Sequence, residues 1–150
     1  GFNTDAVGFE QSLSPLLQGH HKHALVLGSG GSSKAVQYVL HQLGISFQLV
    51  RRQAKQPGEL TYDQLTDSII QAATVIINAT PVGMLPNELD CPRIPFNSIG
   101  PDHLVYDLIY KPPVTRFLAK AAEQGATVKN GFEMLLIQAE ANWQIWNQTS

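Results

Sequence analysis

Cysteine, charge and long apolar runs are all scarce in this chain of 150 residues. A single cysteine, Cys91, permits no internal disulfide and fits a reducing compartment. Charged residues make up only 15% of the sequence and the net charge is −2, so there is no basic surface for nucleic acid or an anionic membrane. No apolar run approaches the roughly 18 residues of a membrane-spanning helix, and the first residues do not resemble a signal peptide. These absences predict a cytoplasmic protein.

What remains is the composition of one globular domain. Apolar residues make up 43% of the chain, which excludes disorder and is enough for a sizeable hydrophobic core. We detect no internal repeat and no low-complexity tract. The chain opens on Gly1 rather than on Met and enters helix-forming sequence almost at once, which predicts a piece of a longer protein.

Strand-like and helix-like segments alternate along the chain. Short runs of strand-forming residues predict strands at 23–27, 46–50, 75–78, 104–108 and 127–129. Apolar stripes at helical spacing predict helices at 5–13, 35–43, 65–70, 115–124 and 132–146. Thr4 is expected to cap the first helix, and Ala122 to face inward from the fourth. Because such alternation builds a parallel sheet with helices on both faces, the predicted fold class is α/β, a doubly wound parallel sheet in three layers, αβα.

A glycine-rich turn separates the first expected strand from the helix after it. It reads Gly28-Ser29-Gly30-Gly31-Ser32-Ser33. Glycines let backbone amides approach an anion closely, and a helix N-terminus adds a fixed positive potential. Ser33 stands where a third glycine is usual, and a small residue suits that packing position. The turn therefore predicts a Rossmann-like site for the pyrophosphate of a dinucleotide.

Two arginines follow the second expected strand, at the position that distinguishes NAD from NADP. An NAD-binding unit usually has Asp or Glu there, which accepts hydrogen bonds from the ribose 2′-hydroxyl. This chain has Arg51 and Arg52, whose guanidiniums suit a 2′-phosphate, with Lys55 as a further basic group nearby. The sequence therefore predicts NADP(H) as the cofactor.

Several other polar segments have a structural explanation beside a functional one. Residues 78–84, Asn-Ala-Thr-Pro-Val-Gly-Met, follow a strand at the edge where such sheets bind ligands, yet Pro and Gly also form simple turns. The histidines within residues 20–23 have no Cys or acid among them, so we expect a solvated loop and no metal site. Trp143 and Trp146 are expected in a core or an interface rather than as a stacking platform.

In their order along the chain, five segments resemble shikimate dehydrogenases, in particular the NADP-binding domain of that family and its flanking helices. The segments are GFNTDAVGF from residue 1, GSGGSS from residue 28, NATPVGM from residue 78, VYDLIYKP from residue 105 and GFEMLLIQA from residue 131. Five ordered motifs that span nearly the whole chain are far more specific than any one of them. The resemblance implies reduction of 3-dehydroshikimate to shikimate by NADPH, in the chorismate pathway of aromatic amino acid biosynthesis.

The resemblance also implies roles for single residues. Asp5 matches the catalytic aspartate of the family, which is paired with a lysine from an earlier part of the enzyme. That lysine handles the hydroxyl proton, while the nicotinamide exchanges a hydride with the same carbon. The positions that approach substrate hydroxyls are Thr4, Asp5, Tyr110 and Gln138. The cofactor positions are Gly28, Ser29, Gly30, Gly31 and Ser32 for the pyrophosphate, Arg51, Arg52 and Lys55 for the 2′-phosphate, and Ala79, Thr80, Leu108 and Gly131 for the ribose and nicotinamide.

Two departures from the family pattern bear on these expectations. The common Asn-Arg-Thr after the second strand is Arg51-Arg52-Gln53 here, which keeps one expected arginine and adds another. The N-terminal substrate domain of the family, which carries the catalytic lysine, has no counterpart in the sequence. We therefore expect residues 1–150 to form a single NADP-binding domain that is catalytically incomplete alone. Residues 1–17 and 132–150 are expected to be helices that would contact the missing domain.

Three questions stay open at this point. Quinate/shikimate dehydrogenases share these motifs and use NAD or NADP, so either acid is a candidate substrate. A non-catalytic dinucleotide-binding module is the alternative of another class, against which the substrate-facing residues argue. The apolar faces of the first and last helices, including Phe9, Trp143 and Trp146, are expected to be exposed, which leaves a monomer and a homo-oligomer both open.

Overall fold

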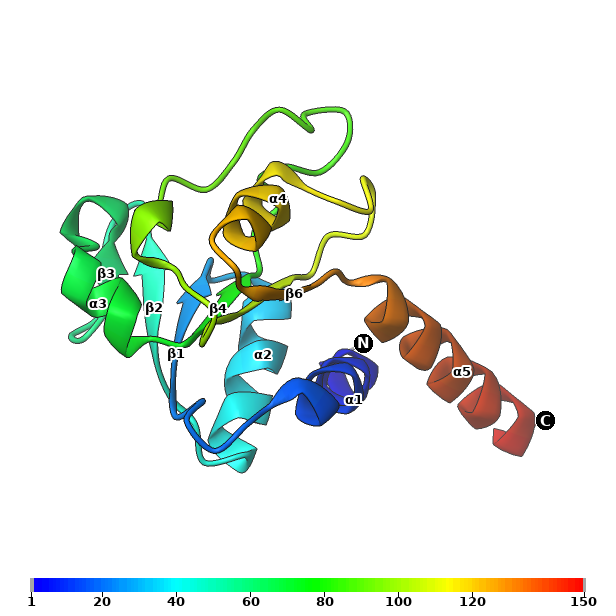
Figure 1. Ribbon diagram of the computed structural model, residues 1–150. Coiled ribbons are helices and arrows are strands. Elements are labelled where there is room, and N and C mark those ends of the chain that lie inside the picture. Colours follow the sequence, from blue (N-terminus) through cyan, green and yellow to red (C-terminus); the bar gives the residue numbers. More distant parts are fainter. Residues whose placement is uncertain (1, 150) are drawn as a thin grey trace.

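The computed structural model describes residues 2–149, with side chains described from residue 4 to residue 147, and it centres on one sheet (Figure 1). The strands are β1 (His23–Leu27), β2 (Ser46–Arg51), β3 (Leu60–Thr61), β4 (Val75–Asn78), β5 (Leu104–Asp107) and β6 (Thr127–Lys129). Their order is β3-β2-β1-β4-β5-β6, and every neighbouring pair is parallel. The chain thus begins in the middle of the sheet and winds outward in both directions, which leaves a switch point between β1 and β4.

Helices cover both faces of this sheet. They are α1 (Phe2–Leu13), α2 (Gly31–Gln42), α3 (Asp67–Ala72), α4 (Arg116–Glu123) and α5 (Phe132–Thr149), with the 3-10 turns η1 (Ser14–Leu16), η2 (Tyr62–Gln64) and η3 (Phe96–Ser98). One hydrophobic cluster joins α1, α2 and α5 to the sheet, and a second cluster joins α3 and α4 to its other face. The predicted doubly wound parallel sheet and its three layers are confirmed.

The alternation of side chains along each strand supplies both clusters. In β1, Ala24 and Val26 belong to the first cluster, whereas Leu25 and Leu27 belong to the second. Successive side chains of a strand point to opposite faces, so a strand covered on both sides must be apolar throughout. This is why the runs that were interpreted as buried strands show no alternation of apolar and polar residues.

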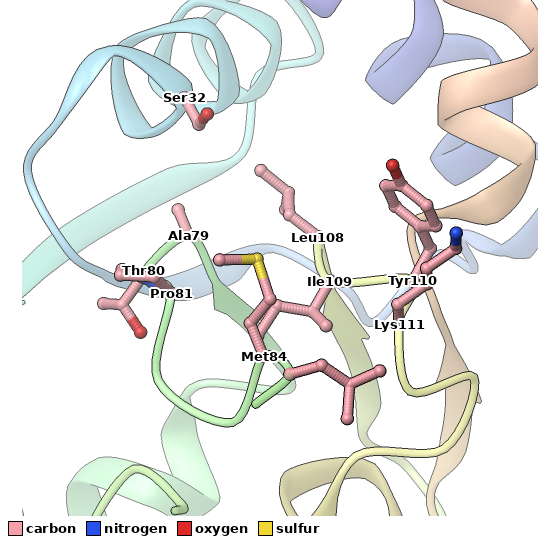
Figure 2. Close-up of a pocket in the computed structure, with 10 residues that line it drawn as sticks. Ser32, Ala79, Thr80, Pro81, Met84, Leu108, Ile109, Tyr110 and Lys111 are labelled. Carbon is pink, nitrogen blue, oxygen red and sulfur yellow. The ribbon is translucent and has the colours of Figure 1, made fainter. Parts of the chain in front are cut away.

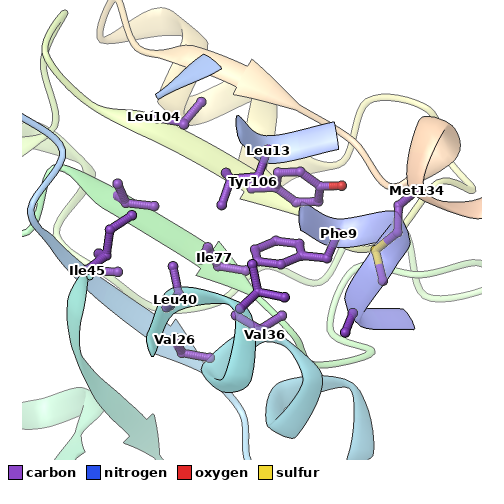
Figure 3. Packing of buried hydrophobic residues seen from close by; sticks show 14 residues of the cluster. Phe9, Leu13, Val26, Val36, Leu40, Ile45, Ile77, Leu104, Tyr106 and Met134 are labelled. Atoms are coloured by element: carbon purple, nitrogen blue, oxygen red, sulfur yellow. The ribbon is translucent and has the colours of Figure 1, made fainter. Parts of the chain in front are cut away.

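The first cluster is closed by α1, which contacts both α2 and α5 (Figure 3). Phe9 is fully buried, and its ring meets the ring of Tyr106 edge-on, with 5.0 Å between the centroids. The Tyr106 hydroxyl lies 2.5 Å from Ser12 Oγ, which gives this buried polar group a partner. Burial raises the pKa of Tyr106 to about 12, so the hydroxyl stays neutral. The first helix is therefore an integral part of this domain.

Several sequence-based expectations about the elements are wrong. Thr4 lies inside α1, which already begins at Phe2, so it is a buried helical residue and not a cap. Phe9 was expected to be exposed, but it is buried because α1 packs on the sheet. Ala122 is exposed, since Phe117, Leu118 and Ala121 already form the inner face of α4. The edge strand β3 was not predicted, because two residues are too few to show a periodic pattern.

The last helix, α5, buries one side chain near its start and exposes its tryptophans. Met134 is its buried contribution to the first cluster, whereas Trp143 is 62% and Trp146 is 72% exposed. Of the two places expected for these tryptophans, the core is therefore excluded and an interface stays a prediction, whereas the exposed apolar face on α5 is confirmed. Within residues 2–149, no helix is both long and apolar enough to cross a membrane.

Candidate functional site

A long depression runs along the carboxyl edge of the sheet, at the switch point. The register places Leu27, the last residue of β1, beside Val50 on one side and Asn78 on the other, so the strands end together. An inner pocket of about 460 Å³ lies over the ends of β4 and β5. An outer groove of about 1430 Å³ extends over the ends of β1 and β2. The two share Ala79, Thr80 and Pro81 in their walls, so they lie side by side, and together they are called the channel below.

The glycine turn depends on the backbone conformation of Gly28 and on its close contact with the end of β4. Gly28 has φ of 106°, and a Cβ there would lie 2.8 Å from Thr80 Cγ2 and 3.1 Å from the carbonyl oxygen of Ala79. Only glycine lets β1 turn this close to the end of β4. Ser33 Oγ donates a 2.8 Å hydrogen bond to the Gly28 carbonyl oxygen, which explains why a serine suits this position.

The N-terminus of α2 is open toward the groove. Its N-cap is Gly30, and no side chain caps the helix. A Cβ at Gly30 or Gly31 would meet nothing within 4 Å, so no other segment packs against these two positions. The first backbone amides of a helix have no partner within it and carry positive potential. Ser29 and Gly30 line the outer groove and Ser32 lines the inner pocket, so this turn faces both parts of the channel.

The two arginines at the end of β2 have different surroundings. Arg51 Nε lies 3.3 Å from Glu59 Oε1, and the same carboxylate accepts hydrogen bonds from the backbone amides of Lys55 (2.9 Å) and Gln56 (3.1 Å). The Lys55 amide, then the Gln56 amide and Arg51, outweigh the effect of burial and hold the pKa of Glu59 below its usual value. Arg52 is exposed and has no ion pair within the described residues. Both arginines and Lys55 line the outer groove.

Under the inner pocket lies a buried polar network that the sequence did not reveal. Asn78 and Asp107 are the last residues of β4 and β5, both fully buried, and Asn78 Nδ2 donates to Asp107 Oδ1 at 3.2 Å. Thr115 Oγ1 donates to Asp107 Oδ2 at 2.7 Å. Burial raises the pKa of Asp107 to about 6, against the lowering by these hydrogen bonds. The sequence feature that could have indicated this network is a polar residue at the end of an otherwise apolar strand, Asn78 in β4 and Asp107 in β5.

The inner pocket collects residues from the segments that follow β4 and β5 (Figure 2). Of its lining residues, the sequence predicted Ser32, Ala79, Thr80, Leu108 and Tyr110. It missed Pro81, Met84, Leu85, Ile109 and Lys111. These are mainly apolar or aliphatic groups on irregular loops, so no periodic pattern marks them. Tyr110 reaches from this pocket toward α1 and α5 in Figure 2.

Gly131 lines neither the inner pocket nor the outer groove, but it lies against Leu108 and Ile109, which line the inner pocket. Its amide donates to the carbonyl oxygen of Ile109 at 3.1 Å. A Cβ at this position would lie 1.9 Å from the carbonyl oxygen of Leu108, which is far inside any permitted contact. Glycine is therefore required for the start of α5 to lie against the segment after β5.

Two of the predicted substrate residues meet from opposite ends of the chain. Gln138 Nε2 on α5 donates a short hydrogen bond to Asp5 Oδ1 on α1. The helices approach closely because Gly8 has no side chain, since a Cβ there would lie 2.7 Å from the Met134 carbonyl oxygen and 2.9 Å from Gln138 Cγ. Thr4 lies one residue before Asp5 on the same helix and is buried. The predicted residues thus form two groups, one on α1 and α5 and one in the channel.

The histidines lie at the opposite edge of the sheet from this channel. His21 is buried, its Nδ1 accepts from the Gln18 amide at 2.9 Å, and its Nε2 lies 3.0 Å from the Asp102 carbonyl oxygen. Burial lowers the pKa of His21, in spite of the hydrogen bond to Asp102. The expectation of a solvated loop is therefore wrong for His21, which holds two loops together. Within residues 2–149, no three His, Cys, Asp or Glu side chains are grouped as metal ligands would be.

Comparisons with known proteins agree with this geometry. No family model matches the chain. A shikimate dehydrogenase (NADP(+)) from Carboxydothermus hydrogenoformans is 35% identical over 164 residues, which cover 100% of this chain and 59% of that protein. The crystal structure of shikimate dehydrogenase from Aquifex aeolicus is similar with a TM-score of 0.81 and 36% identity, over 97% of this chain and 56% of that one. Shikimate 5-dehydrogenase from Thermus thermophilus, in complex with NADP(H) and shikimate, gives a TM-score of 0.79 and 29% identity, over 95% of this chain and 56% of that one.

The match concerns a defined part of these proteins. The chain spans 59% of the length of the Carboxydothermus relative and 57% of several others, and the matched part is their C-terminal portion. Within this chain, both the sequence match and the structural match cover at least 95% of the residues in the three examples above. Over nearly its whole length, the chain is therefore similar to the C-terminal portion of shikimate dehydrogenases.

Proposed function

We propose that this chain forms the NADP(H)-binding part of a shikimate dehydrogenase, an enzyme that reduces 3-dehydroshikimate to shikimate with NADPH. The names of the relatives and the complex of one of them with NADP(H) and shikimate support the proposal. Because the chain spans less than two thirds of those relatives, the activity is proposed for the longer protein.

The observation that carries the proposal is the order of chemical environments along the channel. At one end Arg52 has no ion-pair partner within the described residues, and Lys55, Arg93 and Lys120 also line the outer groove. In the middle lies the uncapped N-terminus of α2. The other end is the mainly apolar inner pocket. A phosphate, a pyrophosphate and a flat nicotinamide ring follow one another in NADP(H) in the same order, so the residues present fit this cofactor.

Each group of residues then has a proposed task. Gly28, Ser29, Gly30, Gly31 and Ser32 would hold the pyrophosphate through backbone amides, and Arg51, Arg52 and Lys55 the 2′-phosphate. Ala79, Thr80, Leu108 and Gly131 would border the ribose and the nicotinamide, which when bound supplies the hydride. All of these residues except Gly31 and Gly131 line the channel, which supports the assignments.

The substrate side is proposed to lie at α1, α5 and Tyr110. Gln138 holds one carboxylate oxygen of Asp5 and so orients the other, which is the catalytic group proposed to meet a substrate hydroxyl and the lysine of the remaining enzyme. Thr4 and Tyr110 are the further hydroxyl groups proposed to contact substrate. Residues 1–17 and 132–150 would contact the substrate domain, and the exposed Trp143 and Trp146 support such a contact.

The expectations about partners and location remain part of the proposal. A net charge of −2 supports a protein without a nucleic acid partner, and the single cysteine supports a cytoplasmic location. The apolar face of α5 would be covered by the substrate domain, or by a second copy when that domain is absent.

Cofactor titration tests the central claim. We expect the chain to bind NADPH more tightly than NADH, and Arg52→Ala to remove most of that preference, because a charge-assisted hydrogen bond contributes about 1.5–3 kcal/mol, roughly ten- to a hundredfold in affinity. Lys22→Ala is the matched control, since Lys22 is an exposed cation just before β1, at the opposite edge of the sheet. Equal affinity of the unmodified chain for the two cofactors would overturn the assignment of the arginines.

The identity of the substrate needs the longer protein. The parent protein, assayed with shikimate and with quinate, and with both oxidised cofactors, is expected to prefer shikimate and NADP. A preference for quinate with NAD would favour a quinate/shikimate dehydrogenase, and the absence of turnover with either acid would favour a dinucleotide-binding module without catalysis.

A further inference from the structure

The carboxylate of Asp107 is the meeting point of three donors. Oδ1 accepts from Asn78 Nδ2 (3.2 Å) and from the backbone amide of Ile109 (3.1 Å), and Oδ2 accepts from Thr115 Oγ1 (2.7 Å). Asp107, Asn78 and Thr115 are 0%, 0% and 1% exposed, so water does not compete for these bonds. A buried charge is costly unless hydrogen bonds surround it in this way.

The donors belong to the two segments that wall the inner pocket. Asn78 organises the first wall, because its Oδ1 accepts from the amide (3.1 Å) and the hydroxyl (2.6 Å) of Thr80, and its Nδ2 also donates to the Val82 carbonyl oxygen. Ile109 lies within the second wall, and Thr115 ends that loop and caps α4 by accepting from the Leu118 amide. Both walls are thus fixed to one anion beneath the pocket.

The chemistry of the three donors calls for a group that only accepts. A carboxylate fulfils this condition, whereas an asparagine amide would turn one of the two positions into a donor. That donor would face the Asn78 amide and the Ile109 backbone amide, which can only donate, or else the Thr115 hydroxyl, whose hydrogen would then lose its acceptor at residue 107. We therefore expect Asp107→Asn, which removes the charge but keeps the size of the side chain, to release one of the two walls without changing the packing of the apolar core.

We propose that Asp107 is a positioning residue that holds the two walls of the inner pocket at the separation required by the nicotinamide half of the cofactor. The inference rests on the proposed NADP(H) site, and it adds a residue that affects cofactor affinity without lining the channel. Asp107 lines neither the inner pocket nor the outer groove, so it acts through residues 80–82 and 108–111.

Half-molecule probes separate this role from general destabilisation. NADPH spans the whole channel, whereas adenosine 2′,5′-bisphosphate has the 2′-phosphate end without the nicotinamide. Calorimetric titration of the full chain with both probes is expected to show that Asp107→Asn weakens NADPH about tenfold, while the affinity for the bisphosphate stays within about twofold. Thr115→Val is expected to act in the same direction with a smaller effect, and Thr115→Ser, which keeps the hydroxyl, to restore the affinity for NADPH.

Each other outcome counts against a defined claim. Unchanged NADPH affinity in the Asp107 and Thr115 variants, or an equal loss for both probes, would overturn the positioning role. If Asp107→Asn does not fold, the Thr115→Val and Thr115→Ser pair decides the question. An unmodified chain that binds NADPH no more tightly than the bisphosphate would overturn the inference alone, whereas one that binds neither probe would overturn the proposed cofactor site as well.

Discussion

The two ends of the channel are built in opposite ways. At the end of β2 the polar groups are charged and partly or wholly exposed, and a short loop held by Glu59 carries them. At the ends of β4 and β5 they are buried, mostly neutral, and held by hydrogen bonds on all sides. A phosphate is recognised by charge, which acts over several ångströms and tolerates a mobile partner. A flat ring is recognised by the shape of its pocket, which requires fixed walls.

The largest expected effect is a substitution that breaks the frame of the inner pocket. Gly131→Ala places a Cβ 1.9 Å from the Leu108 carbonyl oxygen, which neither backbone segment can relieve by a small shift. We expect a loss of at least about 4 kcal/mol in the free energy of unfolding, measured by urea denaturation. Gly19→Ala is the control, because a Cβ there meets nothing within 4 Å and should change stability by less than about 0.5 kcal/mol. A variant at residue 131 as stable as the control would contradict the close approach.

The next effect concerns pH and the buried carboxylate. The pKa of Asp107 is raised from 3.8 to about 6 in the folded protein, so the folded state binds this proton more tightly than the unfolded state does. Its contribution to stability is therefore greatest below pH 3.8, decreases as the pH rises toward 6, and is constant above that, a change of about 3 kcal/mol.

Urea denaturation at several pH values measures this contribution as a difference. The free energy of unfolding of Asp107→Asn minus that of the unmodified chain should rise between pH 4 and pH 7, because Asn does not titrate. A difference that stays level over this range would show that the carboxyl titrates at its ordinary pKa.

The smallest expected effect lies at the phosphate end. Glu59→Gln keeps an oxygen for the amides of Lys55 and Gln56 but removes the charge that faces Arg51. Because Arg52 has no such partner among residues 2–149, we expect the affinity for NADPH to change by less than about threefold. Isothermal titration of both variants with NADPH compares their affinities. A larger loss of NADPH affinity in Glu59→Gln than in Arg52→Ala would reverse the assignment of the two arginines.

The same variant carries a pH signature. The pKa of Glu59 is lowered, mainly by the Lys55 amide, so its charge stabilises the fold above the ordinary value of 4.5 and this contribution is lost as the pH falls through the lower, folded value. Glu59→Gln is therefore expected to be less stable than the unmodified chain at pH 7 and to approach it at low pH. Equal stability at pH 7 would show that the charge of Glu59, with the Lys55 and Gln56 amides and Arg51 around it, contributes nothing measurable.

The sequence predicted those parts of the channel that are formed by residues close together in the chain. The turn at Gly28 and the position of Arg51 and Arg52 after β2 depend on residues close together in the chain, and the structure places them on one groove. The contact of Asp5 with Gln138 joins residues 133 apart in sequence, and it was accessible only through the resemblance to a family. Glu59 and Asp107 were not predicted as functional groups, because isolated polar residues carry no periodic signal.

By itself, the sequence determined the alternation of strands and helices, the glycine turn and the basic residues after β2, since these follow from periodicity, backbone freedom and charge over short stretches. Only the tertiary structure decided that Phe9 is buried, that Glu59 pairs with Arg51 and leaves Arg52 to the groove, and that one buried carboxylate joins both walls of the inner pocket. These features depend on which distant segments meet. Such meetings are set by the packing of whole helices on the sheet rather than by any local pattern.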